Sequence, residues 1–252
     1  MRKKRTSEQA TVDSMLPELG LLFMQEQYKD YAEKAAKEGL DHVGYLERLA
    51  EGELTLRRDK NVQRRIDMAR FPVIKLLEQF DWDWPKKISR PQVQQLFRFG
   101  FLEDKTNAIF LGGVGLGKSH LATALGYAAC QRGMKVLFKT AIDVINGLEA
   151  AQAAGRLSQE LRKYRNPDLL ILDELGYLPL DKRGADLLFQ IISQRYEQGS
   201  LVITTNRAFK QWPEIFNNDS ILTSAILDRL LHKANVIKIE GPSYRMKDQV
   251  EF

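Results

Sequence analysis

A glycine-rich loop between a short apolar stretch and a helix constrains this chain more than any other feature. Residues 112–119 read Gly-Gly-Val-Gly-Leu-Gly-Lys-Ser and follow the apolar residues 107–111. Glycines let the backbone curl tightly enough to aim successive N–H groups at phosphate oxygens. Residues 120–131 are typical of a helix, whose positive N-terminal end would face the same phosphates. The sequence therefore predicts a strand–loop–helix unit that binds a nucleotide through its phosphates.

Individual residues of this phosphate loop have predicted roles. Lys118 is expected to reach the β- and γ-phosphates, and Ser119 is expected to hold Mg²⁺. The predicted nucleotide contacts run from the first glycine to the residue after the motif: Gly112, Gly113, Val114, Gly115, Leu116, Gly117, Lys118, Ser119 and His120.

A second apolar stretch ends in two carboxylates. Residues 168–174 read Asp-Leu-Leu-Ile-Leu-Asp-Glu, which predicts a buried strand with Asp173 and Glu174 at its C-terminal end. That edge is where open α/β sheets bind ligands. We expect Asp173 to hold Mg²⁺ through water and Glu174 to act as general base toward an attacking water. Transfer of phosphate to water needs such a base, which argues against a metabolic kinase.

Two polar side chains further along the chain each have two interpretations. Asn206 follows an apolar stretch that begins at residue 200, and it either senses the γ-phosphate and orients the water or serves as turn chemistry. Arg229 lies in an amphipathic helical pattern over residues 226–231. Either Asp228 beside it forms an ordinary surface ion pair, or Arg229 reaches a neighbouring subunit's nucleotide as an arginine finger.

Strand and helix patterns alternate after residue 106. The apolar strand candidates are 107–111, 135–139, 169–172, 201–204 and 235–239. Near-continuous apolar strands separated by helices predict an α/β fold with a parallel sheet buried on both faces. Two helical pieces, 142–154 and 157–164, lie between the second and third strands, which is more than a simple crossover requires.

The preceding part of the chain is predicted to be helical. We expect a small all-α domain over residues 1–70 that serves DNA or partner binding and assembly, a connector over 71–106 and the α/β domain over 107–252. The predicted helices of the first domain cover residues 14–37, 41–50 and 53–70. The last of these carries six cations that form either a solvated face or a surface that tracks phosphates: Arg57, Arg58, Lys60, Arg64, Arg65 and Arg70. The connector is rich in aromatic side chains, most of them expected to pack and some to border an adenine pocket.

Composition narrows the class of protein. The 252 residues hold 38 Lys and Arg against 33 Asp and Glu, and residues 1–100 hold 19 against 16. This balance permits a nucleic-acid partner only through local clusters. The single cysteine, Cys130, forms no intrachain disulfide, suits a reducing cytoplasm and is expected to be buried. The three scattered histidines do not suggest a metal site, and the absence of a run of 18 apolar residues argues against a membrane span.

Taken in order, these motifs resemble those of AAA+ ATPases. The closer resemblance is to the DnaC-like helicase-loader branch and, within it, to the IstB-type transposition helper ATPases of insertion sequences. It rests on Gly-Leu-Gly-Lys-Ser-His-Leu-Ala at 115–122, Leu-Asp-Glu-Leu-Gly at 172–176, Thr-Thr-Asn at 204–206 and Leu-Asp-Arg-Leu at 227–230. Ala-Arg-Phe-Pro at 69–72 extends it toward the N-terminus, so that it covers nearly the whole chain.

The resemblance implies an ATPase with ATP and Mg²⁺ as ligands. It implies Lys118, Ser119 and Asp173 at the nucleotide and metal, Glu174 as catalytic glutamate and Asn206 as sensor. It also implies a cytoplasmic homo-oligomer with nucleotide at the subunit interfaces and Arg229 acting in trans. The resemblance implies that such assemblies bind and deform duplex DNA and recruit a partner, IstA-like transposase to the bound DNA. The alternative is a DnaC-like replicative helicase loader that uses ATP as a switch.

One departure from the AAA+ pattern is visible. Only 13 residues follow Ile239, too few for the C-terminal helical lid that usually carries a second sensing arginine. Arg245 either serves a related role or is simply a tail residue. Without a lid, tight binding and hydrolysis are expected to depend on the neighbouring subunit.

Overall fold

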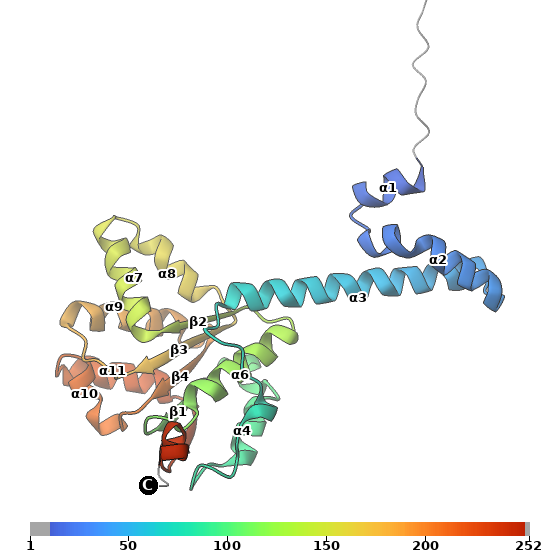
Figure 1. Cartoon of the computed structure of the whole chain (residues 1–252). Helices are drawn as coiled ribbons and strands as arrows, with labels where there is room; N and C mark the ends of the chain where they lie inside the picture. The colour runs from blue at the N-terminus through green and yellow to red at the C-terminus, as the bar shows by residue number, and fades with distance from the viewer. Residues whose placement is uncertain (1–10, 250–252) are drawn as a thin grey trace, which may run out of the picture. The chain divides into compact units, whose positions relative to one another are not determined.

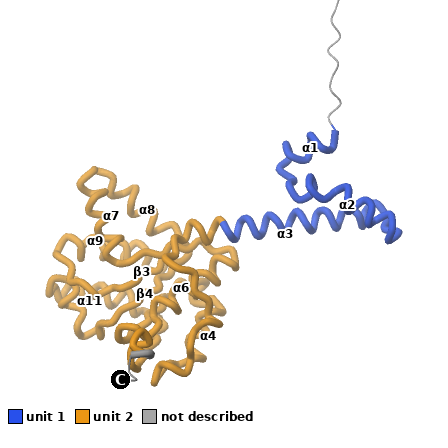
Figure 2. The backbone as a smooth tube through the Cα atoms, viewed as in Figure 1, with its two compact units in different colours: residues 1–63 blue, residues 64–252 orange. Residues whose placement is uncertain are grey.

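The chain divides into two units, residues 1–63 and 64–252 (Figure 2). The computed structural model describes residues 11–249, with side chains described as far as residue 246. The second unit contains the sheet and every residue predicted for the nucleotide site. No helix between residues 11 and 249 is long and apolar enough to cross a bilayer.

The first unit consists of α1 (Val12–Glu18), α2 (Leu22–Glu38) and the larger part of α3 (His42–Ala69). The prediction of one helix over residues 14–37 was wrong, because the chain breaks at Gly20, whose φ of +67° favours glycine. The predicted gap between the second and third helices was also wrong. Gly52 lies inside the continuous helix α3. A glycine is needed there because a Cβ atom would collide with the Phe23 ring of α2.

A buried carboxylate joins α2 to α3. Among residues 11–63 only two apolar side chains, Ala35 and Leu49, are buried, and Glu53 is buried with them. Its carboxylate accepts hydrogen bonds from the backbone N–H groups of Phe23 (2.8 Å) and Met24 (3.3 Å), and from Nε of Arg57 (3.2 Å). Burial acts to raise the pKa of Glu53, but these donors outweigh it and the net pKa is lowered. Glu53 therefore caps the N-terminus of α2 from a different helix.

The second unit is built on a five-stranded parallel sheet. Its strands are β1 (Ala108–Gly112), β2 (Val136–Thr140), β3 (Leu169–Leu175), β4 (Ser200–Thr205) and β5 (Asn235–Ile239). Their spatial order is β2-β3-β4-β1-β5 (Figure 1). All five predicted strands are confirmed, with β3 three residues longer than expected. Because the strands are parallel, the C-terminal ends of β1, β3 and β4 meet at one edge.

Helices cover both faces of this sheet. Leu170 and Leu172 pack in one core with α7 (Ala141–Ala153), α9 (Lys182–Arg195) and α11 (Ser220–Leu231). Ile171, between them, faces α6 (Lys118–Gln131) on the other side, where Gly126 allows close approach. Cys130 of α6 is fully buried as predicted, and burial raises the pKa of its thiol to about 11. The predicted three-layer α/β fold is confirmed.

Shorter elements complete the unit. η1 (Leu77–Gln79), α4 (Arg90–Leu96) and α5 (Gly100–Glu103) precede the sheet, and η2 (Phe209–Gln211) and α10 (Trp212–Ile215) follow β4. α8 (Leu157–Arg165) pairs with α7 between β2 and β3, which confirms the inserted helices. The described residues after β5 form only the short helix η3 (Tyr244–Gln249), so no helical lid covers the sheet within residues 240–249.

A buried arginine that forms no ion pair among the described residues ties together the edge where the strands begin. Arg195 is 1% exposed and donates hydrogen bonds to five carbonyl oxygens, those of Tyr164, Arg165, Pro167, Asp168 and Ser200. Burial lowers the pKa of Arg195 to about 10, so the guanidinium stays charged at neutral pH. The residue ties the end of α8 to the starts of β3 and β4, and nothing in the sequence pattern indicated it.

Candidate nucleotide-binding site

The phosphate loop connects β1 to α6. Gly115 and Gly117 have φ angles of +73° and +80°, a region that glycine occupies without strain. Gly117 is the N-cap of α6 and no side chain caps the helix, so its first N–H groups are available to an anion. Lys118 is 5% exposed, and its Nζ donates a 2.6 Å hydrogen bond to the carbonyl of Gly113. The predicted strand–loop–helix unit is present, with its cation held inside the loop.

Ser119 and Asp173 meet beneath this loop. The Ser119 hydroxyl donates a 2.9 Å hydrogen bond to Oδ1 of Asp173, which is buried in β3. In nucleotide sites, carboxylate and hydroxyl oxygens together with phosphates and water are the ligands that suit Mg²⁺. The two residues predicted for Mg²⁺ therefore lie together and fit that ion.

Glu174 leaves the regular strand geometry. The register between β3 and β4 shifts between Leu172 and Leu175, and Glu174 has a φ of +60°. Such a bulge re-aims a side chain, and here the Glu174 carboxylate is exposed and lines the cleft above the loop. A glutamate in left-handed backbone is uncommon and costs free energy, which the surrounding contacts must offset.

Thr204 supplies one of those contacts and was missed by the sequence reasoning. Its buried hydroxyl donates to Oδ1 of Asp173 at 2.5 Å and accepts the backbone N–H of Glu174 at 2.9 Å. One side chain of β4 thus fixes both acidic residues of β3. The sequence contained a signal, since Thr204 opens the Thr-Thr-Asn motif, but only Asn206 was given a role.

Asn206 lies just past the end of β4, beside β3. Its Oδ1 atom is buried and has no hydrogen-bond partner among the described residues. A buried acceptor without a donor costs about 1–3 kcal/mol, so this oxygen is suited to a water or ligand proton. The unpartnered Oδ1 atom agrees with the predicted role of Asn206 in sensing the γ-phosphate and orienting the water, and that role stays a prediction.

A cleft of about 640 Å³ opens above the phosphate loop. Nucleotide-sized ligands occupy cavities of this order. Its floor includes residues 115–120, and Glu174 and Tyr177 stand on one side. Residues of the connector form the other side, among them the aromatic residues Phe80 and Trp84, and the prediction that some of these border an adenine pocket stays a prediction. The C-terminal residues Tyr244 and Arg245 also line it.

His120 and Phe80 attach the connector to the loop. Nε2–H of His120 donates to the carbonyl of Leu76 at 2.8 Å, and burial lowers the pKa of His120, which favours the neutral ring. The Phe80 ring packs on Gly117, at 2.6 Å from where a Cβ atom would stand, and edge-on against Trp82. The side chain of His120 therefore positions the cleft wall as well as bordering the nucleotide site.

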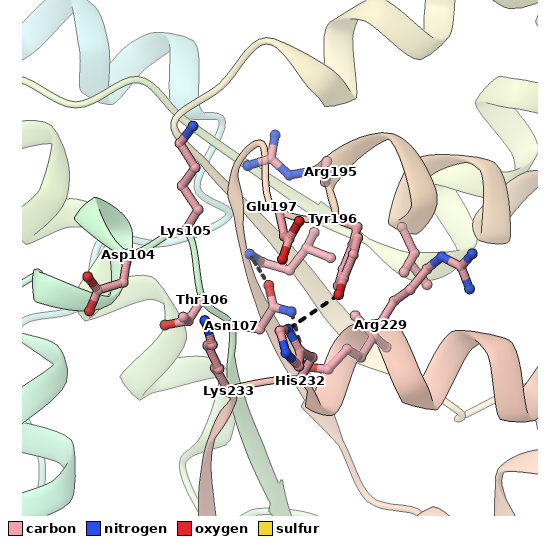
Figure 3. A pocket seen from close by; sticks show the side chains of 13 residues that line it. Asp104, Lys105, Thr106, Asn107, Arg195, Tyr196, Glu197, Arg229, His232 and Lys233 are labelled. Atoms are coloured by element: carbon pink, nitrogen blue, oxygen red, sulfur yellow. Dashed lines mark hydrogen bonds between the residues drawn. The ribbon is translucent and has the colours of Figure 1, made fainter.

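Arg229 lies apart from the phosphate loop of its own chain. It borders a small pocket of about 40 Å³ at the edge where β1, β4 and β5 begin, with Asn107, Tyr196 and His232 (Figure 3). This volume suits water only. The guanidinium lies 5.0 Å from the Phe189 ring centroid, and one of its nitrogens donates to the carbonyl of Ala225 at 2.9 Å. Arg229 therefore does not face the phosphate loop of its own chain. This placement agrees with the prediction that it acts on the nucleotide of a neighbouring subunit.

The six cations at residues 57–70, for which the sequence left open a solvated face or a surface that tracks phosphates, do not form one set. Arg57 pairs with Glu53 and belongs to the packing of the first unit. In the second unit, Arg65, Arg70, Lys139 and Lys163 border a cavity of about 490 Å³ between the end of α3, β2, α7 and α8. Exposed on the same inserted helices or beside them are Arg156, Arg162 and Arg165.

The sheet order, the phosphate loop and the acidic pair at the adjacent strand end define the class: a P-loop AAA+ ATP-binding protein. Solved structures support the fold. The DnaI structure superposes with a TM-score of 0.55 at 20% identity over 70% of this chain and 92% of that one. The DnaC helicase loader gives 0.51 at 23% identity over 65% and 96%.

The chain belongs to the family of IstB-like ATP binding proteins, whose sequence model matches residues 14–251. It is 40% identical over 86% of its length to the ATP-binding protein of insertion sequence IS21 from Pseudomonas aeruginosa, covering 82% of that protein. It is 37% identical to that of IS5376 from Geobacillus stearothermophilus, over 92% of both chains. The predicted resemblance is confirmed.

Proposed function

We propose that this chain hydrolyses ATP as a helper of DNA transposition. The observation that carries the proposal is the arrangement around Thr204, which presents Glu174 to the cleft beside the buried Asp173. A nucleotide-binding protein without hydrolysis has no need of a strained glutamate at this position. The relatives named for insertion sequences supply the biological setting.

In the proposed reaction each residue has one task. Backbone N–H groups of residues 113–119 and Lys118 bind the phosphates, while Ser119 and Asp173 hold Mg²⁺, which supplies charge neutralisation when bound. Glu174 accepts a proton from the attacking water, and Asn206 orients that water. Arg229 of a neighbouring subunit stabilises charge that develops on the transferred phosphoryl group.

The proposed target is duplex DNA, bound by an ATP-dependent oligomer that deforms it and recruits a transposase. Residues 64–252 hold 27 Lys and Arg against 21 Asp and Glu, whereas residues 1–63 hold 11 against 12. The second unit therefore carries a net positive charge, whereas the charge of the first unit is close to balanced. The exposed cations near α8 are better placed to contact phosphates.

Binding of a labelled DNA duplex at several salt concentrations, in ATP and in ADP, tests this proposal. We expect affinity to fall steeply with salt, and Arg162→Ala to reduce the slope of log K against log salt by about 0.9 for one lost phosphate contact. Arg98→Ala removes an arginine that is also exposed, in the turn after α4, and should leave the slope unchanged. Absence of ATP-dependent duplex binding at moderate salt would refute the proposal. A pull-down that recovered only replicative helicase would favour the loader function instead.

A further inference from the structure

Arg229 is held in its own chain by two contacts, neither of them an ion pair. Its Nη1 atom donates to the carbonyl of Ala225, one turn earlier in α11, at 2.9 Å. Its Cζ atom lies 5.0 Å from the centroid of the Phe189 ring. Within residues 11–246 no carboxylate pairs with this guanidinium, so the surface ion pair of Asp228 that the sequence left open is not formed with it. The Arg229 side chain points away from His232 (Figure 3).

The Phe189 ring is an anchored surface for this arginine. Phe189 lies on α9, which packs beside α11 in the core on one face of the sheet. Its neighbours on α9, Leu188 and Ile192, are fully buried in that core. The ring packs against the same core and is itself half-buried, as is Arg229. The core therefore determines where the ring stands, and the ring in turn determines where the guanidinium lies.

This arrangement leaves the guanidinium able to bind an anion. An arginine side chain carries several N–H donors in one plane, and the Ala225 carbonyl accepts from only one of its nitrogens. A cation above an aromatic ring is attracted to the ring face, and this contact uses none of those donors. A side chain that is already ordered loses less conformational entropy when it binds a phosphate. The ring can therefore hold Arg229 without competing with a phosphate for its N–H groups.

We propose that Phe189 is a positioning residue that orders Arg229 for the nucleotide of a neighbouring subunit. The inference rests on the proposed action of Arg229 in trans and adds the residue on which that action depends. Phe189 does not line the nucleotide cleft of its own chain, so it acts only through the arginine. Removing the ring should therefore slow hydrolysis and leave nucleotide binding at the phosphate loop unchanged.

Steady-state ATP hydrolysis by Phe189→Leu, measured on the full chain with Mg²⁺ and duplex DNA, tests the inference. Leucine keeps the apolar contact with the core and removes the ring face, so we expect kcat to fall about threefold to thirtyfold. Affinity for a non-hydrolysable ATP analogue should stay within about twofold of the parent. Phe189→Tyr keeps the ring and should keep the parent kcat. The matched control is Phe97→Leu, which should also keep the parent kcat, since Phe97 is a half-buried residue of the same unit with no described cation over its ring.

Mixed assemblies give a readout that a loss of folding would not move. Glu174→Gln subunits retain Phe189 and Arg229, so mixing them with Phe189→Leu should raise the rate per intact Glu174 toward that of the parent. Mixing Phe189→Leu with Arg229→Ala should give no such rise, because both variants lack the same contribution to the neighbouring site. An unchanged kcat in Phe189→Leu, an equal loss in Phe189→Tyr, or a rise in both mixtures would overturn the inference.

The inference and the proposed function can be told apart when one fails. Arg229→Ala mixed with Glu174→Gln tests action in trans without involving Phe189. No recovery there, in assemblies shown to form, would refute action in trans and the role of Phe189 with it. Recovery there, together with the parent rate in Phe189→Leu, would remove only the role of Phe189.

Discussion

Replacing Thr204 with valine is the sharpest test of how the acidic pair is held. The substitution removes one hydroxyl and keeps the side-chain shape at a position that is fully buried. Asp173 then loses one of the two hydroxyl donors to its Oδ1, with Ser119 remaining. The backbone N–H of Glu174 loses its acceptor at the residue with positive φ.

The expected cost follows from these two contacts. A hydrogen bond to a charged group contributes about 1.5–3 kcal/mol, and a buried donor left unpaired costs about 1–3 kcal/mol. Since both contacts share one oxygen, they do not simply add. We expect the free energy of unfolding to fall by about 2–4 kcal/mol. A domain with the usual free energy of unfolding can lose this much and remain folded.

Urea denaturation and steady-state ATP hydrolysis measure the outcome. The matched control is Thr205→Val on the same strand, since Thr205 is equally buried and its oxygen accepts only the Arg207 N–H, at 3.2 Å, among the described contacts. The control should lose about 1 kcal/mol and keep its activity. Thr204→Val should hydrolyse ATP at least about tenfold more slowly. Misplacing Glu174 needs to raise the activation free energy by only about 1.4 kcal/mol to have that effect. Equal destabilisation of the two variants, or hydrolysis by Thr204→Val at the parent rate, would refute the reasoning.

Three further predictions address the site and the first unit. Lys118→Ala should abolish ATP binding in a titration, whereas Glu174→Gln should bind ATP normally and stop hydrolysis; loss of binding in both would contradict the separate roles. Arg229→Ala should keep ATP affinity and lose about 10³-fold in hydrolysis, and mixing it with Glu174→Gln should restore activity; no recovery in mixed assemblies that demonstrably form would contradict action in trans. Because the pKa of Glu53 is lowered on folding, its contribution to stability is present at neutral pH and is lost as pH falls through the folded pKa. Glu53→Gln should therefore be less stable at pH 7 and show a shallower loss of stability in acid, whereas parallel curves would count against the cap.

The sequence predicted the sheet and the phosphate loop because both are encoded locally. Buried parallel strands appear as apolar runs, and the loop has fixed spacing between its glycines, Lys118 and Ser119. The place of Asp173 and Glu174 at the end of β3 was predicted for the same reason, since these acids directly follow such a run.

The features that were missed depend on which segments become neighbours. The role of Thr204 follows from the pairing of β3 with β4 and from the bulge between them, neither of which a one-dimensional pattern specifies. The predicted helices left a gap at residues 51–52, yet Gly52 lies within α3 and allows the close approach of Phe23 from another helix. The five carbonyl partners of Arg195 come from two separate segments, residues 164–168 and residue 200, and leave no motif.

Light scattering on the full chain, with and without duplex DNA, in ATP and in ADP, tests the central claim most directly. A single chain has a mass of 28.9 kDa. The account predicts a much larger particle that forms with ATP and DNA together and not with ADP. A mass that DNA leaves unchanged in ATP would contradict an ATP-dependent assembly on DNA.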